Sequence, residues 1–128
     1  MHYIDLHTHS IFSEGSLTPT ELVKKMKTYG IHTVSLTDHN TFAGTEEATR
    51  AGKRMNVNVI PGIEIYSSYK NHKLHILGYN IDITNSAFRE FVFELEERHL
   101  MDVRVASNRL NNLGIKVDCD ALCDTRSR

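Results

Sequence analysis

The chain has 128 residues, a size that suits one folded domain, and 40% of its residues are hydrophobic while 24% are charged. This composition excludes a disordered chain, which would contain far fewer apolar residues. The formal net charge of -1 excludes broad attraction of nucleic acid to the whole surface, so an anionic substrate would need a local site.

Strands and helices alternate in the first part of the chain. Residues 3–6 predict a short strand. A helix is predicted after Thr18, because this threonine can cap it, Pro19 suits its first position and Glu21 completes a capping box. Gly30 is predicted to end this helix, since glycine adopts a left-handed conformation at little cost.

The same alternation continues toward the middle of the chain. Residues 32–37 predict a second strand, residues 48–55 a helix of small side chains, and residues 57–65 a third strand. Residues 75–79 predict a further strand, which can pair with residues 66–69 through a turn. Strands that alternate with helices predict parallel pairing through right-handed crossovers.

The last long element is predicted to be one helix over residues 85–113. Apolar positions recur every three or four residues along it and predict one stripe, formed by Phe88, Val92, Leu95, His99, Val103, Ala106, Leu110 and Leu113. Gly114 closes the helix, and the polar tail at residues 118–128 is expected to fray. Cys119 and Cys123 lie four apart in this tail and are expected to be free thiols.

Neither targeting nor membrane signals are found. The first residues lack the basic and apolar regions of a signal peptide. No apolar run approaches the ~20 residues that span a bilayer. Because the chain also has no repeat, low-complexity tract or linker, we expect one cytoplasmic domain over residues 1–128, without a membrane partner.

Histidines and carboxylates gather at the ends of the predicted strands. His7 and His9 lie two apart where the first strand ends, so both side chains can point to one side and reach one metal ion. His39 follows the second strand, Glu64 lies near the end of the third, and His75 lies on the next strand. In parallel α/β folds the carboxyl ends of the strands share one rim, so these side chains are expected on one face.

Two interpretations of this group are open. The side chains could be half-exposed residues that bind nothing, but a polar cluster at strand ends is costly unless it binds a ligand. As a metal site, the mixture of imidazole and carboxylate favours zinc, manganese or iron over calcium or magnesium. A carboxylate between histidines can bridge two ions, which would activate water and orient a phosphate.

Four motifs carry a resemblance to a known family. They are DLHTHS at residues 5–10, SLTDHN at residues 35–40, PGIEI at residues 61–65 and HILGY at residues 75–79. In this order and spacing they resemble the first four motif regions of PHP (polymerase and histidinol phosphatase) metal-dependent phosphoesterases, from Tyr3 to about Ile115. The resemblance is greatest to nucleoside 3′,5′-bisphosphate phosphatases and 5′-to-3′ exonucleases that act on short oligonucleotides.

The resemblance implies a fold and a set of metal ligands. The implied fold is a partial PHP-type β/α barrel: the family has a distorted seven-stranded α/β barrel with two to three divalent ions. Residues 1–128 would supply the N-terminal part of that domain, namely its first three to four β/α units plus the long helix. The implied ligands are His7, His9, Glu14, His39, Glu64 and His75.

Roles within this set also follow from the resemblance. The implied ion sites are His7 and His9 with Glu64, then Glu64 with His75, and last His39 with Glu14. The family usually has aspartate where Glu14 stands, and glutamate is longer by one methylene. The implied catalytic residues are His7, His9, His39 and Glu64, and Asp5 and Asp38 would orient ligand histidines.

Members of the family are longer and supply further histidine and aspartate ligands from their second half, whereas this chain has no histidine after His99. The first hypothesis is a phosphoesterase that hydrolyses phosphate monoesters or short oligonucleotide phosphodiesters by metal-activated water. The absent ligands favour an alternative, a catalytically incomplete PHP fragment that acts as a binding or structural module. An enzyme like histidinol-phosphate phosphatase is a further alternative. Open barrel edges would also favour a homo-oligomer.

Other candidate residues have simpler interpretations. Three histidines without a partner of matching spacing are expected to be exposed, namely His2, His32 and His72. His99 lies on the apolar stripe of the long helix and is expected in a core or an interface. Arg98 and Arg104 are expected on a solvated face rather than at a phosphate.

Overall fold

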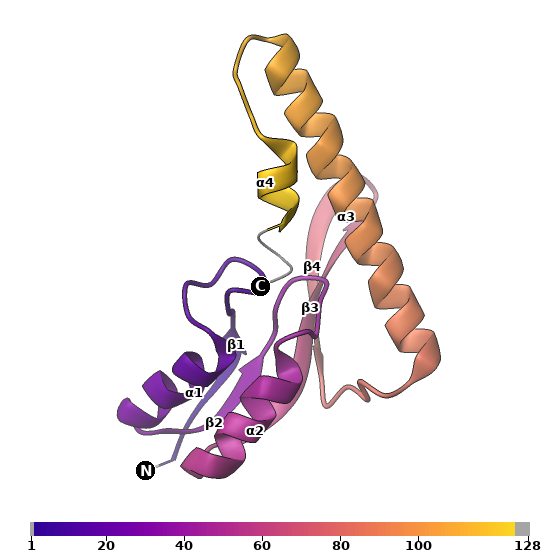
Figure 1. The fold of residues 1–128 in the computed structure, drawn as a ribbon. Coiled ribbons are helices and arrows are strands. Elements are labelled where there is room, and N and C mark those ends of the chain that lie inside the picture. The colour runs from indigo at the N-terminus through magenta and orange to yellow at the C-terminus, as the bar shows by residue number, and fades with distance from the viewer. Residues whose placement is uncertain (1, 125–128) are drawn as a thin grey trace.

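The structure is a computed structural model that describes residues 2–124. Its elements in chain order are β1 Tyr3–Thr8, α1 Pro19–Thr28, β2 Ile31–Leu36, α2 Thr45–Met55, β3 Asn58–Tyr69, β4 His72–Tyr79, α3 Ser86–Asn112 and α4 Cys119–Asp124 (Figure 1). The predicted alternation of strands and helices is confirmed as far as the third strand. None of the helices among the described residues is both long and apolar enough to cross a membrane.

The capping signals of α1 act as predicted. The backbone N–H of Glu21 donates to the hydroxyl of Thr18 at 3.2 Å, and the carboxylate of Glu21 accepts from the backbone N–H of Thr18 at 2.9 Å. These two bonds satisfy donors that a helix start otherwise leaves unpaired. Gly30 follows the helix with φ of +74°, a left-handed conformation that allows the chain to turn into β2.

The four strands form one sheet in the order β1-β2-β3-β4. Strands β1, β2 and β3 pair in parallel, with α1 and α2 in the two crossovers. Both helices lie side by side on one face of the curled sheet (Figure 1), so the fold is a partial barrel of the expected type. The main core lies between these helices and the sheet, and its buried residues are Leu22, Val23, Val34, Leu36, Ala48, Ala51 and Val57.

The fourth strand pairs with residues 66–69 through a turn, as predicted, and does not continue the β/α repeat. Strand β4 runs antiparallel to β3, so it does not belong to a further β/α unit. Only Lys70 and Asn71 separate the two strands, and both have positive φ, at 46° and 67°. A connection of two residues can make a hairpin but cannot make the long crossover that parallel strands need. The residues predicted as a separate strand at 66–69 are the continuation of β3.

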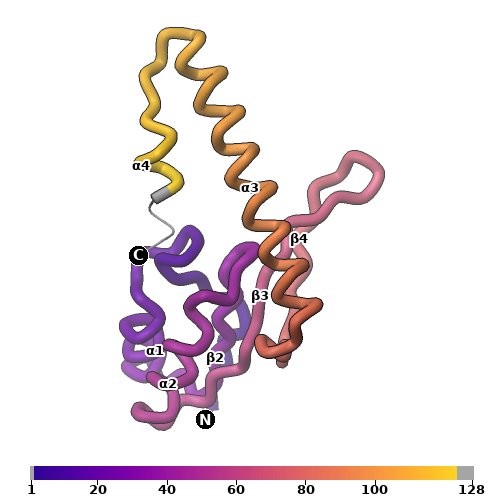
Figure 2. Tube along the Cα trace, turned by 45° about the vertical axis from the view of Figure 1, so that its right-hand side comes forward, coloured from indigo at the N-terminus to yellow at the C-terminus, as the bar shows by residue number. Residues whose placement is uncertain are grey.

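Helix α3 has the predicted extent, but its apolar stripe is covered only over the first half. The side chain of Asn85 caps the helix by accepting from the backbone N–H of Phe88 at 3.0 Å. Val92 is buried, whereas Leu110 and Leu113 are 38% and 77% exposed. Figure 2 shows why: α3 runs past the end of the sheet and diverges from the tip of the β3–β4 hairpin, and its second half lies against α4.

The tail was expected to fray, and this prediction is wrong for its first part. Helix α4 forms there, and its first turn is capped by Asp118, whose carboxylate accepts from the backbone N–H of Ala121 at 3.0 Å. Residues 125–128 lie outside the described residues. Cys119 and Cys123 are free, as predicted, with their sulfur atoms 4.0 Å apart.

Candidate metal centre

The carboxylate of Glu64 lies at the middle of a ring of imidazoles. Its Oε2 atom is 2.8 Å from Nε2 of His7, 3.2 Å from Nε2 of His9 and 3.5 Å from Nε2 of His39. Its Oε1 atom is 2.8 Å from Nδ1 of His75. Glu64 is only 3% exposed, so four nitrogen atoms face one buried carboxylate.

Two kinds of strand pairing bring these side chains together. The parallel ladder between β2 and β3 continues past the end of β2 as a bridge between His39 and Glu64. His75 lies opposite Tyr66 in the antiparallel ladder, and Tyr66 is two residues beyond Glu64 on the same face of β3. The expected rim at parallel strand ends therefore holds for the first three strands, while His75 reaches the site from within the hairpin.

Glu14 joins the cluster from the loop between β1 and α1. Its Oε2 atom lies 3.2 Å from Nε2 of His39 and its Oε1 atom 3.9 Å from Nε2 of His9, although Glu14 is 61% exposed. The loop packs closely on the backbone of the histidine motif, because a Cβ at Gly15 would lie 2.2 Å from the carbonyl oxygen of His9. Glycine is therefore the residue that allows Glu14 to approach the site.

All six expected ligand residues lie together. They form three overlapping groups, and within each group the ligand atoms lie within 4.8 Å of one another. The groups are His7, His9 and Glu64; His9, Glu14 and His39; and His39, Glu64 and His75. Two ligands at ~2.1 Å from a tetrahedral ion lie about 3.4 Å apart. The separations of 2.8 to 3.9 Å between these nitrogen and oxygen atoms bracket that value, so the donor set fits divalent transition-metal ions.

The charge states also fit a cation. Burial alone would raise the pKa of Glu64, but the hydrogen bond from His7, the charge of His39 and the hydrogen bond from His75 outweigh it, and the pKa lies below its ordinary value. The pKa of His39 lies below its ordinary value, because burial and the charges of His9 and His75 together outweigh the raising effect of Glu64 and Glu14. A charged carboxylate beside a neutral imidazole is the state that binds a metal ion.

The two aspartates expected to orient histidines act on the site indirectly. The buried carboxylate of Asp38 accepts from the backbone and the hydroxyl of Ser10 at 2.7 and 2.6 Å and from the hydroxyl of Ser13 at 2.6 Å. The Ser13 hydroxyl lies 3.3 Å from Nδ1 of His9, so Asp38 reaches the imidazole through Ser13. Asp5 accepts from the backbone N–H of His7 at 3.2 Å and does not contact its ring.

Tyr66 and Asn40 were not predicted as part of the site. The Tyr66 ring stacks on His39 with 4.2 Å between ring centroids and lies 4.8 Å from the ring of His75. The side chain of Asn40 accepts from the backbone N–H of Tyr66 at 2.9 Å, which ties the loop after β2 to β3. The two-residue spacing from Glu64 was the available signal for Tyr66, because it places both side chains on one face of a strand.

The remaining candidates lie outside the cluster. His2, His32 and His72 are exposed, as predicted. The rings of His2 and His32 contact each other, with 4.5 Å between their centroids. His99 is half-buried on α3, with its ring centroid 6.3 Å from that of Tyr66. Arg98 is exposed and pairs with Glu94 four residues earlier at 3.3 Å.

Comparisons with known proteins agree with this geometry. The model of the PHP domain family matches residues 5–113. The 5′-3′ exoribonuclease Rnm of Salmonella typhimurium is 39% identical over 115 residues, which cover 87% of this chain and 39% of that protein. The 3′,5′-nucleoside bisphosphate phosphatase of Chromobacterium violaceum is 34% identical over 112 residues, covering 88% of this chain and 39% of the phosphatase.

A solved structure has the same fold. The structure of an amidohydrolase from Chromobacterium violaceum, with bound sulfate and no metal, superposes with a TM-score of 0.88 at 31% identity. The match covers 98% of this chain and 44% of that protein. The chain therefore spans about two-fifths of the length of the relatives that it matches.

Proposed function

Because the chain belongs to the PHP domain family, we propose that its ring of histidines and glutamates binds divalent metal ions and hydrolyses phosphate esters. The observation that carries this proposal is the position of Glu64, whose two carboxylate oxygens face four imidazoles at 2.8 to 3.5 Å. A buried carboxylate with this many nitrogen neighbours is suited to hold two ions at once. Metal-dependent phosphoesterases are also what the family resemblance implies.

The three groups of ligand atoms would hold two to three ions, of zinc, manganese or iron. With two ions, the group of His7, His9 and Glu64 and the group of His39, Glu64 and His75 share only Glu64, and each would supply three protein donors, the number found in catalytic zinc sites that leave a position open for water or substrate. A third ion would take His39 together with Glu14, because one imidazole nitrogen binds one ion. When bound, such ions lower the pKa of a water ligand and neutralise charge on a phosphate ester.

The residues of the chain fix the geometry of this centre. Glu64 would bridge two of the ions, and the hydrogen-bonded chain from Asp38 through Ser13 would hold the ring orientation of His9. The Tyr66 ring covers His39 and His75 on one side and limits how they can rotate. His7, His9, His39 and Glu64 are the proposed catalytic residues.

A phosphorylated small molecule or the end of a short oligonucleotide is the proposed substrate. The exoribonuclease and the nucleoside bisphosphate phosphatase among the relatives support a nucleotide. The near-neutral net charge supports recognition at one local site over binding along a nucleic-acid backbone. Residues 1–128 would form the N-terminal part of the PHP domain.

Metal stoichiometry tests the proposal. Purified protein is equilibrated with zinc or manganese, separated from free metal and measured by elemental analysis, and hydrolysis of a phosphate monoester is then assayed. We expect at least one ion per chain in the wild type and a loss of about 100-fold or more in metal affinity for Glu64→Gln. Glu97→Gln, an exposed glutamate on α3, is the matched control and should behave as the wild type.

Two results would contradict the proposal in different ways. Full metal content and activity in Glu64→Gln would show that this carboxylate does not bridge the ions. Metal binding without any hydrolysis would favour the second candidate function, a PHP module that is catalytically incomplete by itself. The observation that favours this second candidate is the span of the chain, which is 39% of the length of the exoribonuclease and the phosphatase.

A further inference from the structure

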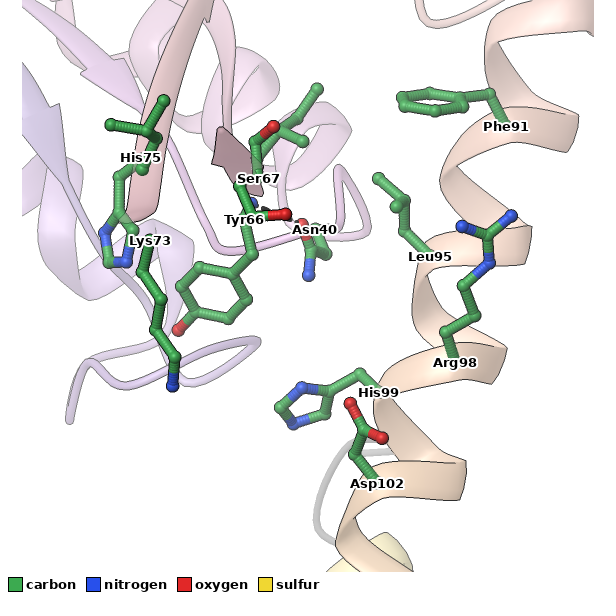
Figure 3. A pocket seen from close by; sticks show the side chains of 13 residues that line it. Asn40, Tyr66, Ser67, Lys73, His75, Phe91, Leu95, Arg98, His99 and Asp102 are labelled. Carbon is green, nitrogen blue, oxygen red and sulfur yellow. Dashed lines mark hydrogen bonds between the residues drawn. The ribbon is translucent and has the colours of Figure 1, made fainter. Parts of the chain in front are cut away.

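A large pocket lies between the β3–β4 hairpin and α3. Its volume is about 910 Å³, within the range of pockets that hold a nucleotide-sized ligand. Figure 3 shows Tyr66, Lys73 and His75 on one side and Leu95, Arg98 and His99 on the α3 side, with the ring of His99 directed toward Tyr66. We call this space the hairpin pocket.

The hairpin pocket is continuous with the metal centre. His75 lines the pocket and also contacts Glu64, and Tyr66 lines the pocket while it stacks on His39. A ligand whose phosphate lies at the metal centre therefore has the pocket as the space for the group next to the phosphate. The pocket can therefore contact that group and select among ligands that differ in it.

The walls of the pocket offer ring faces and little net charge. Tyr66, Phe91 and His99 provide aromatic surface, and Leu95 provides aliphatic surface between them. The cations Lys73 and Arg98 are offset by Asp102 in the pocket, and Arg98 also pairs with Glu94 at 3.3 Å. This balance does not favour a second phosphate, whereas ring faces favour a flat, weakly charged ligand.

We propose that the hairpin pocket binds the heteroaromatic base of a nucleotide, with the rings of Tyr66 and His99 in contact with the base. The proposal rests on the proposed function, because the phosphate of the same nucleotide would lie at the metal centre. It assigns His99 as a residue that determines specificity and distinguishes nucleotides from aliphatic phosphate esters.

The two rings lie next to each other in the wall of the pocket. The centroids of the Tyr66 and His99 rings are 6.3 Å apart, and the rings are inclined by 31°. Figure 3 shows them side by side, so a flat ligand in the pocket can contact both rings.

A matched pair of ligands isolates the base. The zinc-loaded full chain is titrated calorimetrically with adenosine monophosphate and with ribose 5-phosphate, which has the same sugar and phosphate but no base. We expect adenosine monophosphate to bind about 10-fold more tightly, the effect of one stacked base. Adenosine, which has no phosphate, is examined on the metal-free chain by saturation-transfer NMR, where its base protons should receive saturation.

Three variants identify the residue responsible. His99→Ala should weaken binding of adenosine monophosphate about 5- to 50-fold, leave ribose 5-phosphate unchanged and abolish saturation of the adenosine base. His99→Phe keeps a ring face and should restore most of the binding. Asn108→Ala, an exposed position on the same helix, is the control and should match the wild type.

The outcomes separate this proposal from the proposed function. Equal affinity for the two phosphates in the wild type, or an equal loss of both in His99→Ala, would overturn the base pocket while metal binding stands. Failure of the chain to retain metal would contradict the proposed function, and the adenosine experiment would then decide about the pocket alone. Absence of base saturation in the wild type would overturn it in that case.

Discussion

Gly15 determines how closely the loop of Glu14 approaches the metal centre. The loop is closed by a hydrogen bond from the backbone N–H of Gly15 to the carbonyl of Ser10 at 2.9 Å. A side chain at this position would meet the backbone of His9 and Ser10 at 2.2 to 2.8 Å, which is closer than atoms can lie. Because both contacts are with backbone, a rotamer change cannot relieve them.

We therefore expect Gly15→Ala to displace Glu14 from His39 and to weaken metal binding at least about 10-fold, with a smaller effect on folding. Metal affinity measured by competition with a chelator checks this prediction. The control is Gly78→Ala, where a Cβ would lie 3.3 Å from the side chain of Ile63. Equal metal affinity in both variants would show that the Glu14 loop does not contribute.

His7, His9 and His39 were predictable from the sequence, because each lies at or just past the end of a parallel strand, where a spacing of two places side chains on one face. Glu64 and His75 lie within β3 and β4, and Glu14, which lies in a loop, was expected only from the family resemblance. The roles of Ser13 and His99 could not be predicted in the same way. They depend on how a loop folds back and how far α3 leans from the hairpin, and neither distance is encoded in a local pattern.

Local helix signals were the most reliable part of the prediction at the scale of elements. The start of α1 follows its capping box, and α3 starts within one residue of the predicted boundary. The pairing of β4 with the end of β3 was also predicted, because residues 70 and 71 leave room only for a tight turn. The apolar pattern of β4 alone would not have given its direction, since this pattern is the same in parallel and antiparallel ladders.

The cap of α1 provides a test at this scale. Thr18→Ala removes the acceptor of the Glu21 backbone N–H and should lower the free energy of unfolding by about 0.5 to 2 kcal/mol. Denaturant unfolding followed by circular dichroism measures this change. Thr28→Ala is the control, because the Thr28 hydroxyl bonds only to a carbonyl of the preceding turn and should cost much less. A loss of equal size in both variants would mean that the cap is not responsible.

At the scale of the whole molecule, apolar side chains remain exposed on the edge strand β1 and along helix α3. On β1, which is an edge of the sheet, Tyr3 and Ile4 are 54% and 62% exposed. On α3 and just after it, Met101, Leu113 and Ile115 are 63%, 77% and 54% exposed. Unpaired strand edges and exposed apolar faces favour association with another polypeptide surface.

We expect the 128-residue chain to form homo-oligomers at micromolar concentration, and sedimentation velocity over a range of concentrations checks this. Ile4→Lys, which places a charge on the edge strand, should shift the distribution toward the monomer. His32→Lys, at an exposed position of the interior strand β2, is the control and should leave the distribution unchanged. A monomeric wild type at all concentrations would contradict the expectation.

Strand β3 takes part in two ladders, and this has a consequence for the order in which the chain folds. Glu64 and His75 are 11 residues apart and meet when the local hairpin closes, an event on the microsecond timescale. Glu64 and His7 are 57 residues apart and meet only after β1 and β2 have docked through their crossovers, which costs more loop-closure entropy. We therefore expect the Glu64–His75 half of the centre to form early and the His7–His9 half to form late, so that a metal ion present during folding would first meet a two-ligand site.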